Sequence, residues 1–170
     1  MQDSPCVPLG RIILRLWKGF MERSLVILKP DAVQRGLVGT ILGRLETRGL
    51  KIVGMKLMLV DEARARRHYD EHKDRPFFPG LISYITSGPV VVLVVAGENV
   101  VKMIRDMVGK TKPFESPPGT IRGDFAIETG RNLIHASDSP ESGEREVPIF
   151  FETGELISEY ERSVDRWIFE

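Results

Sequence analysis

His135 is the residue whose type and surroundings best fit nucleophilic chemistry. It lies in the segment 130–139, after an expected strand and before small polar residues. A carboxylate that accepts one ring N–H leaves the other ring nitrogen free as a nucleophile, and an ordinary imidazole, with a pKa of about 6.5, is mostly neutral at pH 7. The carboxylates close to it in the sequence are Glu128, Asp138, Glu144 and Glu146. From the residues alone, any of the four could orient the ring.

A second group of residues is cationic. Lys29, Arg105 and Arg122 each lie at the edge of an expected element, and Thr111 lies in an adjoining loop. Lysine offers a point charge and arginine a planar fork that suits phosphate oxygens, which phosphoryl transfer requires. Taken singly, each would be an ordinary exposed charge. Because residues 36–39 are not followed by Gly-Lys-Ser/Thr, a phosphate site would have to form without a Walker loop.

The segment His68–His72 matches the H-x-x-E-H pattern of some zinc hydrolases. Two histidines four residues apart on a helix can share a metal ion, but a catalytic site also needs a third ligand and an open position. In a chain with 28% charged residues such a pattern arises by chance. We therefore interpret the segment as a solvated helical face with two ordinary histidines, and zinc hydrolysis remains the third hypothesis for function.

Composition excludes several classes of protein. The chain has 170 residues, 24 basic and 24 acidic, so its formal net charge is zero, which argues against a dedicated nucleic-acid binder. Its single cysteine, Cys6, excludes an intramolecular disulfide and a cysteine-built zinc site. No apolar run approaches the roughly 20 residues of a membrane span. These features indicate a cytoplasmic protein of one domain.

Hydrophobic periodicity predicts the elements that must position these residues. Strands are expected at Ser24–Leu28, Leu50–Val60, Val90–Ala96 (buried and central) and near Ile121–Ile127. Helices are expected at Val38–Leu45 (ended by Gly49), Glu62–Glu71 (capped by Asp61) and Val100–Val108 (ended by Gly109). This order suits helices that cover one face of a four-stranded antiparallel sheet.

Residues 1–20 differ from the rest of the chain. Pro5, Pro8 and Gly10 break any early helix, and Arg15 interrupts the apolar stretch that follows, so the segment does not read as a secretory signal. We expect residues 1–20 to be an N-terminal extension, with disorder as one prediction for it, and residues 21–170 to be a single domain.

From Met21 to Glu170 the chain resembles a nucleoside diphosphate kinase. The resemblance rests first on Asn132-Leu133-Ile134-His135-Ala136-Ser137-Asp138-Ser139, the family's signature around its phosphorylated histidine. Further family motifs are Leu28–Val33, Arg75–Phe78, Ser87–Val90 and Gly119–Phe125. The resemblance implies a ferredoxin-like α/β (α+β) sandwich, a four-stranded antiparallel sheet with helices packed on it. It also implies a ping-pong transfer of the γ-phosphate from a nucleoside triphosphate, typically ATP, to a nucleoside diphosphate, with broad base specificity.

The same resemblance implies roles for individual residues. His135 would become the phosphohistidine through Nδ1, Glu146 would orient it, and Lys29 would be the third catalytic residue. The residues that match nucleotide-binding positions are Lys29, Tyr69, Phe77, Leu81, Arg105, Thr111, Arg122 and Asn132. Phe77 would stack on the base, with Leu81 beside it. Mg²⁺ would be the cofactor, held by phosphate oxygens and water without dedicated protein ligands.

Partners follow from the resemblance as well. The substrates would be nucleoside triphosphates such as ATP and GTP and nucleoside or deoxynucleoside diphosphates. No stable nucleic-acid partner and no membrane partner are expected. The loop 110–119 and the C-terminus 166–170 resemble segments that pack between subunits, which favours a homohexamer over a tetramer. Thr129 departs from the family, since many members have an apolar residue there on the base. The competing hypothesis from another class is a non-catalytic nucleotide-binding or single-strand-binding module.

Overall fold

An antiparallel sheet with the strand order β2-β3-β1-β4 forms the middle layer of the computed structural model, which describes residues 21–169. Its strands are β1 (Glu22–Leu28), β2 (Lys51–Leu59), β3 (Pro89–Gly97) and β4 (Ile134–Ala136). β3 lies between β2 and β1 and is buried from Val90 to Ala96, as its run of apolar residues predicts. The prediction of an extension at residues 1–20 lies outside the described residues.

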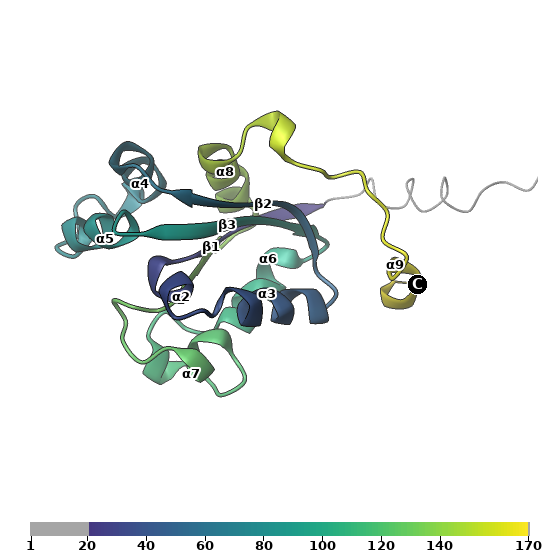
Figure 1. Ribbon diagram of the computed structural model, residues 1–170, viewed down its shortest axis with the longest axis horizontal. Coiled ribbons are helices and arrows are strands. Elements are labelled where there is room, and N and C mark those ends of the chain that lie inside the picture. The colour runs from purple at the N-terminus through teal and green to yellow at the C-terminus, as the bar shows by residue number, and fades with distance from the viewer. Residues whose placement is uncertain (1–20, 170) are drawn as a thin grey trace, which may run out of the picture.

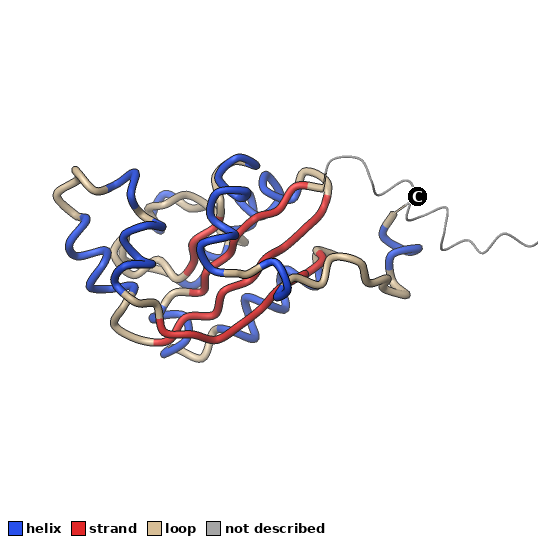
Figure 2. Tube along the Cα trace, turned by 90° about the horizontal axis from the view of Figure 1, so that it is seen from above, coloured by secondary structure: helices blue, strands red, loops and turns tan. Residues whose placement is uncertain are grey.

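Most helices pack against this sheet, and the last helix lies beyond one end of it (Figures 1 and 2). The α-helices are α2 (Pro30–Gln34), α3 (Val38–Thr47), α4 (Glu62–His68), α5 (Phe78–Ile85), α6 (Val100–Val108), α7 (Ile121–Phe125), α8 (Pro140–Phe150) and α9 (Asp165–Ile168). The 3₁₀ turns are η1 (Asp70–His72), η2 (Pro113–Glu115) and η3 (Thr153–Glu155). Among the described helices, none combines the length and the hydropathy that a membrane crossing requires.

Both faces of the sheet are covered, so the prediction of helices on one face is wrong. One hydrophobic core contains α3, α6 and the even-numbered β1 residues Val26 and Leu28. The other contains α4, α5, α8 and the odd-numbered residues Leu25 and Ile27. Figure 1 shows α4 and α8 on one side of the sheet and α3 and α6 on the other. Because both sets of β1 side chains are apolar, each face must be covered to exclude water.

The fourth strand predicted near Ile121–Ile127 is also wrong. Residues 121–125 form α7, whose N-terminus is capped by the Thr120 hydroxyl, which accepts a hydrogen bond from the Gly123 amide at 3.1 Å. The cap favours a helix over the strand predicted there. The fourth strand is β4, so His135 lies within a strand and pairs with Ile27 of β1.

Most other predicted boundaries are confirmed by their local chemistry. Gly49 and Gly109 follow α3 and α6 with φ values of +87° and +84°, a conformation that glycine adopts without strain. Asp61 caps α4 by accepting the Arg64 amide at 2.7 Å. The predicted helix to Glu71 is too long, because α4 ends at His68 and the chain continues as η1.

The contact between α8 and β1 is unusually close. A Cβ atom built on Gly143 of α8 would lie 1.9 Å from the carbonyl oxygen of Arg23 in β1. Real Cβ atoms do not approach a backbone oxygen to that distance, so only glycine permits this approach. The position of α8 on the sheet therefore depends on the absence of a side chain at Gly143.

We expect Gly143→Ala to push α8 away from β1 and to destabilise the fold by about 1–3 kcal/mol, as overpacking does elsewhere. The measurement is the free energy of unfolding in urea. Gly43→Ala is the matched control, since Gly43 lies inside α3 with nothing within 4 Å of its added Cβ. That change should stabilise the protein by about 0.5–1 kcal/mol through helix propensity. Equal free energies for the two variants would contradict the close-packing argument.

Candidate active site

All residues proposed from the sequence for catalysis or nucleotide binding line one cavity of about 1110 Å³. They are Lys29, Tyr69, Phe77, Leu81, Arg105, Thr111, Arg122, Asn132, His135 and Glu146. They come from segments far apart in the sequence, including the end of β1, the α4–α5 region, α6, α7, β4 and α8. The volume suits a nucleotide-sized ligand.

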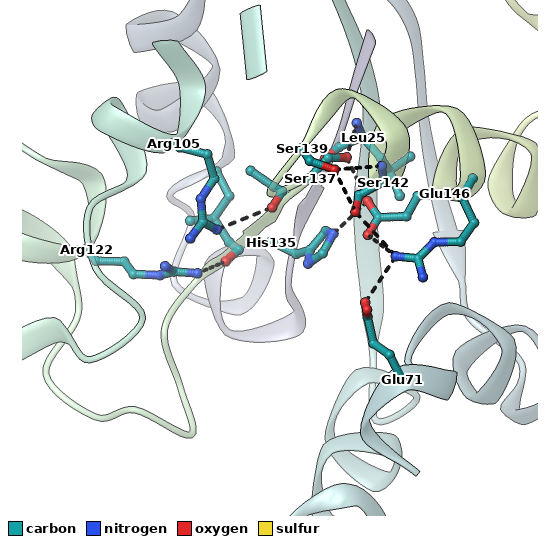
Figure 3. A network of polar contacts seen from close by, with 12 residues as sticks. Leu25, Glu71, Arg105, Arg122, His135, Ser137, Ser139, Ser142 and Glu146 are labelled. Carbon is teal, nitrogen blue, oxygen red and sulfur yellow. Dashed lines mark hydrogen bonds and ion pairs between the residues drawn. The ribbon is translucent and has the colours of Figure 1, made fainter. Parts of the chain in front are cut away.

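His135 is held by a short chain of hydrogen bonds (Figure 3). Its Nε2 lies 3.1 Å from Oε2 of Glu146, and the same oxygen accepts a bond of 2.7 Å from the Ser137 hydroxyl. Ser137 in turn accepts the backbone amide of Leu25 at 2.9 Å. Since a carboxylate only accepts, Nε2 carries the ring proton and Nδ1 keeps its lone pair.

Glu146 reaches His135 because of where α8 begins and where it packs. The Ser139 hydroxyl caps α8 by accepting the Ser142 amide at 3.1 Å, and Pro140 occupies the first turn. From this start, Glu146 falls on the side of α8 that faces the sheet and is only 3% exposed. Its charge is compensated by the two donors described above, as a buried carboxylate requires.

Lys29 and Asn132 form a second polar contact on the cavity wall. The Lys29 ammonium donates to Oδ1 of Asn132 at 2.7 Å, and the Asn132 amide donates to the carbonyl of Thr111 at 2.9 Å. Burial, and then the positive charge of Arg122, lower the pKa of Lys29 to about 8. The Asp31 carboxylate opposes this lowering, but the hydrogen-bond partner of the ammonium is the neutral amide of Asn132, which leaves the charge suited to receive an anion.

Arg122 is buried and binds the backbone around the cavity. Its nitrogens donate to three backbone carbonyls, those of Asn132 (3.2 Å), Gly109 (3.2 Å) and Ile134 (2.6 Å). Burial, and then the charge of Arg105, lower its pKa. Both guanidinium groups line the cavity, so like charges are held together there. An anionic ligand would relieve their repulsion.

The other end of the cavity is aromatic and more open. The Phe77 ring is 56% exposed at the start of α5, and its centroid lies 5.7 Å from that of His72. Leu81 and Thr129 also line this cavity. An exposed ring beside a cavity offers a stacking surface that does not select one base by hydrogen bonding.

His68 contradicts the prediction of a solvated histidine face. It is 4% exposed, its ring lies 4.6 Å from that of His135 between centroids, and neither of its nitrogens has a hydrogen-bond partner. Burial lowers its pKa well below the ordinary value. Its apolar packing against Phe150, at 5.1 Å between centroids, was not visible in the sequence. The only hint was its helical spacing of three from Ala65, which is also buried.

The H-x-x-E-H pattern does not collect into one set of metal ligands. Among residues 21–169, the group of three whose ligand atoms lie within 4.8 Å of one another is His68, His135 and Glu146, which omits the rest of the pattern. Glu71 instead pairs with Arg145 of α8 at 3.1 Å. The geometry therefore gives no support to the zinc-hydrolase hypothesis.

A family model described as nucleoside diphosphate kinase matches residues 22–156. The chain belongs to the nucleoside diphosphate kinase family. The match includes the histidine, the buried carboxylate and the cationic residues that line the cavity.

Related proteins agree over most of the chain. A nucleoside diphosphate kinase from Roseiflexus castenholzii is 68% identical over 150 residues, which are 88% of this chain and 100% of the relative. One from Archaeoglobus fulgidus is 54% identical over 150 residues, with 88% and 99% of the two chains covered. The expected family and enzyme class, a nucleotide phosphotransferase, are thus confirmed.

Solved structures agree with the fold. A halophilic nucleoside diphosphate kinase from Halobacterium salinarum in complex with CDP superposes with a TM-score of 0.86 at 48% identity, covering 89% of this chain and 100% of that one. A family member from Babesia bovis gives a TM-score of 0.84 at 44% identity, covering 87% and 99%. The expected ferredoxin-like α/β sandwich is confirmed.

The neutral, buried state of His68 leads to a pH-dependent prediction. Below pH 6.5 the unfolded chain binds a proton at this histidine that the native state does not bind, so stability falls as the pH falls. We expect His68→Phe to remove up to about 1.4 kcal/mol of this loss per pH unit. Urea unfolding at pH 7, 6 and 5 measures the difference. Equal slopes for wild type and His68→Phe would contradict the prediction.

Proposed function

We propose that this chain transfers the γ-phosphate of a nucleoside triphosphate to a nucleoside diphosphate through a phosphohistidine on Nδ1 of His135. The observation that carries the proposal is the contact between Nε2 of His135 and the buried Glu146 carboxylate, 3.1 Å apart. It fixes the ring and leaves Nδ1 as the nucleophilic atom of a histidine that lines the cavity.

The proposed phosphoryl transfer to His135 forms one bond and breaks one bond. The Nδ1 lone pair attacks the γ-phosphorus, a P–N bond forms, and the bond to the bridging oxygen breaks so that the nucleoside diphosphate leaves. The positive charge that develops on the ring is balanced by Glu146, with the proton staying on Nε2. A second diphosphate then attacks the phosphohistidine and regenerates neutral His135.

The cationic wall would stabilise the transferring phosphoryl group. Lys29, Arg105 and Arg122 place positive charge along the cavity that contains His135, where charge spreads over the phosphate oxygens. Asn132, Thr111 and Tyr69 would contact the phosphates and ribose from the same wall. Phe77 would stack on the base and Leu81 would flank it, while Thr129 offers little apolar surface to its other face.

Mg²⁺ is the cofactor we propose, and the residues present fit a metal bound through the nucleotide. The acidic residues lining the cavity are Glu71, Asp138 and Glu146. Glu71 is paired with Arg145 and Glu146 with His135, so they do not form a cage of free carboxylates. Phosphate oxygens and water would hold the ion, which would neutralise phosphate charge.

A homohexamer is the assembly we propose, in the cytoplasm. Support comes from apolar side chains exposed in the described chain, which a partner would cover. They are Met55 (56%), Leu57 (66%) and Leu59 (69%) on the edge strand β2, Phe114 (77%) in the loop 110–119 and Trp167 (78%) in α9. Both segments expected to pack between subunits thus carry an exposed aromatic ring.

The proposed function is tested by label transfer. Incubation with Mg²⁺ and γ-labelled ATP, without acceptor, should place acid-labile, alkali-stable label on the wild type, and added GDP should discharge it. His135→Ala should take up no label yet still bind ADP. A wild-type protein that binds nucleotide but takes up no label would support the non-catalytic binding module instead.

The pKa of Lys29, about 8 in the free protein, predicts how nucleotide affinity changes with pH. Above pH 8 the free protein loses the ammonium that attracts phosphate, so the dissociation constant for ADP should rise by up to about tenfold per pH unit. Lys29→Met should bind ADP about 10- to 100-fold more weakly at pH 7, because a charge-assisted hydrogen bond is lost.

Calorimetric titration of both proteins from pH 7 to pH 9.5 provides the measurement. The affinity of wild type should approach that of Lys29→Met at the upper end of this range. A ratio of the two dissociation constants that stays constant with pH would contradict a lowered pKa for Lys29.

A further inference from the structure

Asp31 belongs to the motif Leu28–Val33, but none of the roles proposed above uses its carboxylate. Its Oδ1 accepts the Tyr84 hydroxyl and the Ala32 amide, the latter at 3.0 Å, and its Oδ2 accepts the backbone amide of Leu133 at 3.1 Å. Asp31 lies at the start of α2, and Leu133 lies 102 residues later in the chain. The carboxylate therefore ties the segment after β1 to the segment that leads into β4.

Leu133 is held in a conformation that leucine avoids. Its φ is +68°, in the left-handed region, and it is fully buried. The other non-glycine residue with positive φ in residues 21–169 is Asn99, whose short polar side chain tolerates this region. A bulky residue stays there only where surrounding contacts impose it.

Those contacts surround the turn at Leu133. Its amide donates to Asp31, and its carbonyl accepts the Lys29 amide at 2.8 Å. Arg122 holds the carbonyls on either side, those of Asn132 and Ile134. Asp31 supplies the acceptor for the Leu133 amide, and without it a buried donor would lose its partner.

The left-handed turn matters because of what stands on either side of it. Asn132 and His135 are three residues apart, and in a regular strand residues of odd separation point to opposite faces. Both nevertheless line the same cavity, while Leu133 and Ile134, which are consecutive, both enter the same hydrophobic core. The backbone reversal at Leu133 is what brings Asn132 and His135 to one side.

We propose that Asp31 is a positioning residue for phosphoryl transfer, which holds Leu133 in the left-handed turn that aligns Asn132 with His135. The inference rests on the proposed function of His135. Tyr84 fixes the carboxylate from the other side: burial raises the pKa of the Tyr84 hydroxyl, so it stays protonated and continues to donate to Asp31. Arg131 lies over the Tyr84 ring at 4.0 Å and holds it in place.

The first test is Asp31→Asn. The side-chain amide of asparagine has a single acceptor oxygen, so either the Leu133 N–H or the Tyr84 hydroxyl meets an NH₂ group instead of an acceptor. We expect the rate constant for label uptake from saturating γ-labelled ATP, per site that becomes labelled, to fall by about 10- to 100-fold, as small misplacements of reacting groups do. Rapid-quench measurements give this rate, and the final label per chain is recorded separately. The affinity of each variant for ADP, measured by calorimetry, shows whether the substitution also weakens nucleotide binding.

A merely structural role for Asp31 would lower the thermal midpoint and the final label per chain but not the rate constant per labelled site. Ile41→Val provides the matched control, because Ile41 is fully buried in the same core but lies on α3, outside the cavity lining. It should lower stability and leave the rate constant unchanged. Tyr84→Phe removes the hydroxyl that holds the Asp31 carboxylate, so the rate constant for label uptake should fall by about three- to tenfold. This variant replaces Asp31→Asn in the test if Asp31→Asn does not fold.

A second test isolates the backbone conformation. Leu133→Gly and Leu133→Ala remove nearly the same side chain, but glycine adopts positive φ freely whereas alanine does not. In the Asp31→Asn background, the glycine variant should be faster than the alanine variant by at least about threefold. With Asp31 intact, the two should differ by less.

The outcomes separate the two proposals. If the wild type takes up no label, the proposed function fails and the role of Asp31 fails with it. If the wild type is labelled but Asp31→Asn and Tyr84→Phe react within twofold of it per labelled site, only the positioning role is overturned. Equal rates for the glycine and alanine variants in the Asp31→Asn background would also overturn it.

Discussion

The Glu146 carboxylate is buried where α8 meets β1, and a buried negative charge is tolerated only if donors surround it. Those donors are Nε2 of His135 and the hydroxyl of Ser137. To meet them, α8 must approach the backbone of β1 to a distance that only Gly143 allows. The helix cap, the close helix–sheet contact and the orientation of His135 are thus parts of one arrangement, and a shift of α8 would change all of them.

The opposite wall of the cavity is arranged around positive charge. Lys29 and Arg122 are buried near each other, and burial lowers the pKa of both. Three of the five N–H donors of Arg122 bond backbone carbonyls, so its charge is fixed in place before any ligand arrives. An anionic phosphate would thus enter a site whose dipoles need little reorganisation, which is the condition for strong electrostatic stabilisation of a transition state.

The candidate site residues were chosen from short motifs, and the structure places all of them around one cavity. The fold was harder to predict, because β4 has only three residues and carries no periodic pattern of its own. Of the four candidate carboxylates, Glu144 and Glu146 both lie on α8, and only its helix phase separates these two: Glu146 faces His135, whereas Glu144 pairs with Arg23. The burial of His68 and the left-handed turn at Leu133 depend on contacts between distant segments, which local patterns do not encode.

The pairing of β4 with the middle of the sheet also bears on how the protein acquires its structure. Leu25 and Ser137, which meet beside His135, are 112 residues apart in the chain. Contacts of such separation form only after a large loop has closed, and they slow folding. During synthesis β1, β2 and β3 emerge long before β4 and α8, so the edge of β1 that will receive β4 stays unpaired meanwhile. The nascent chain would gain its phosphate-binding wall and its nucleophile together, at the final stage of folding.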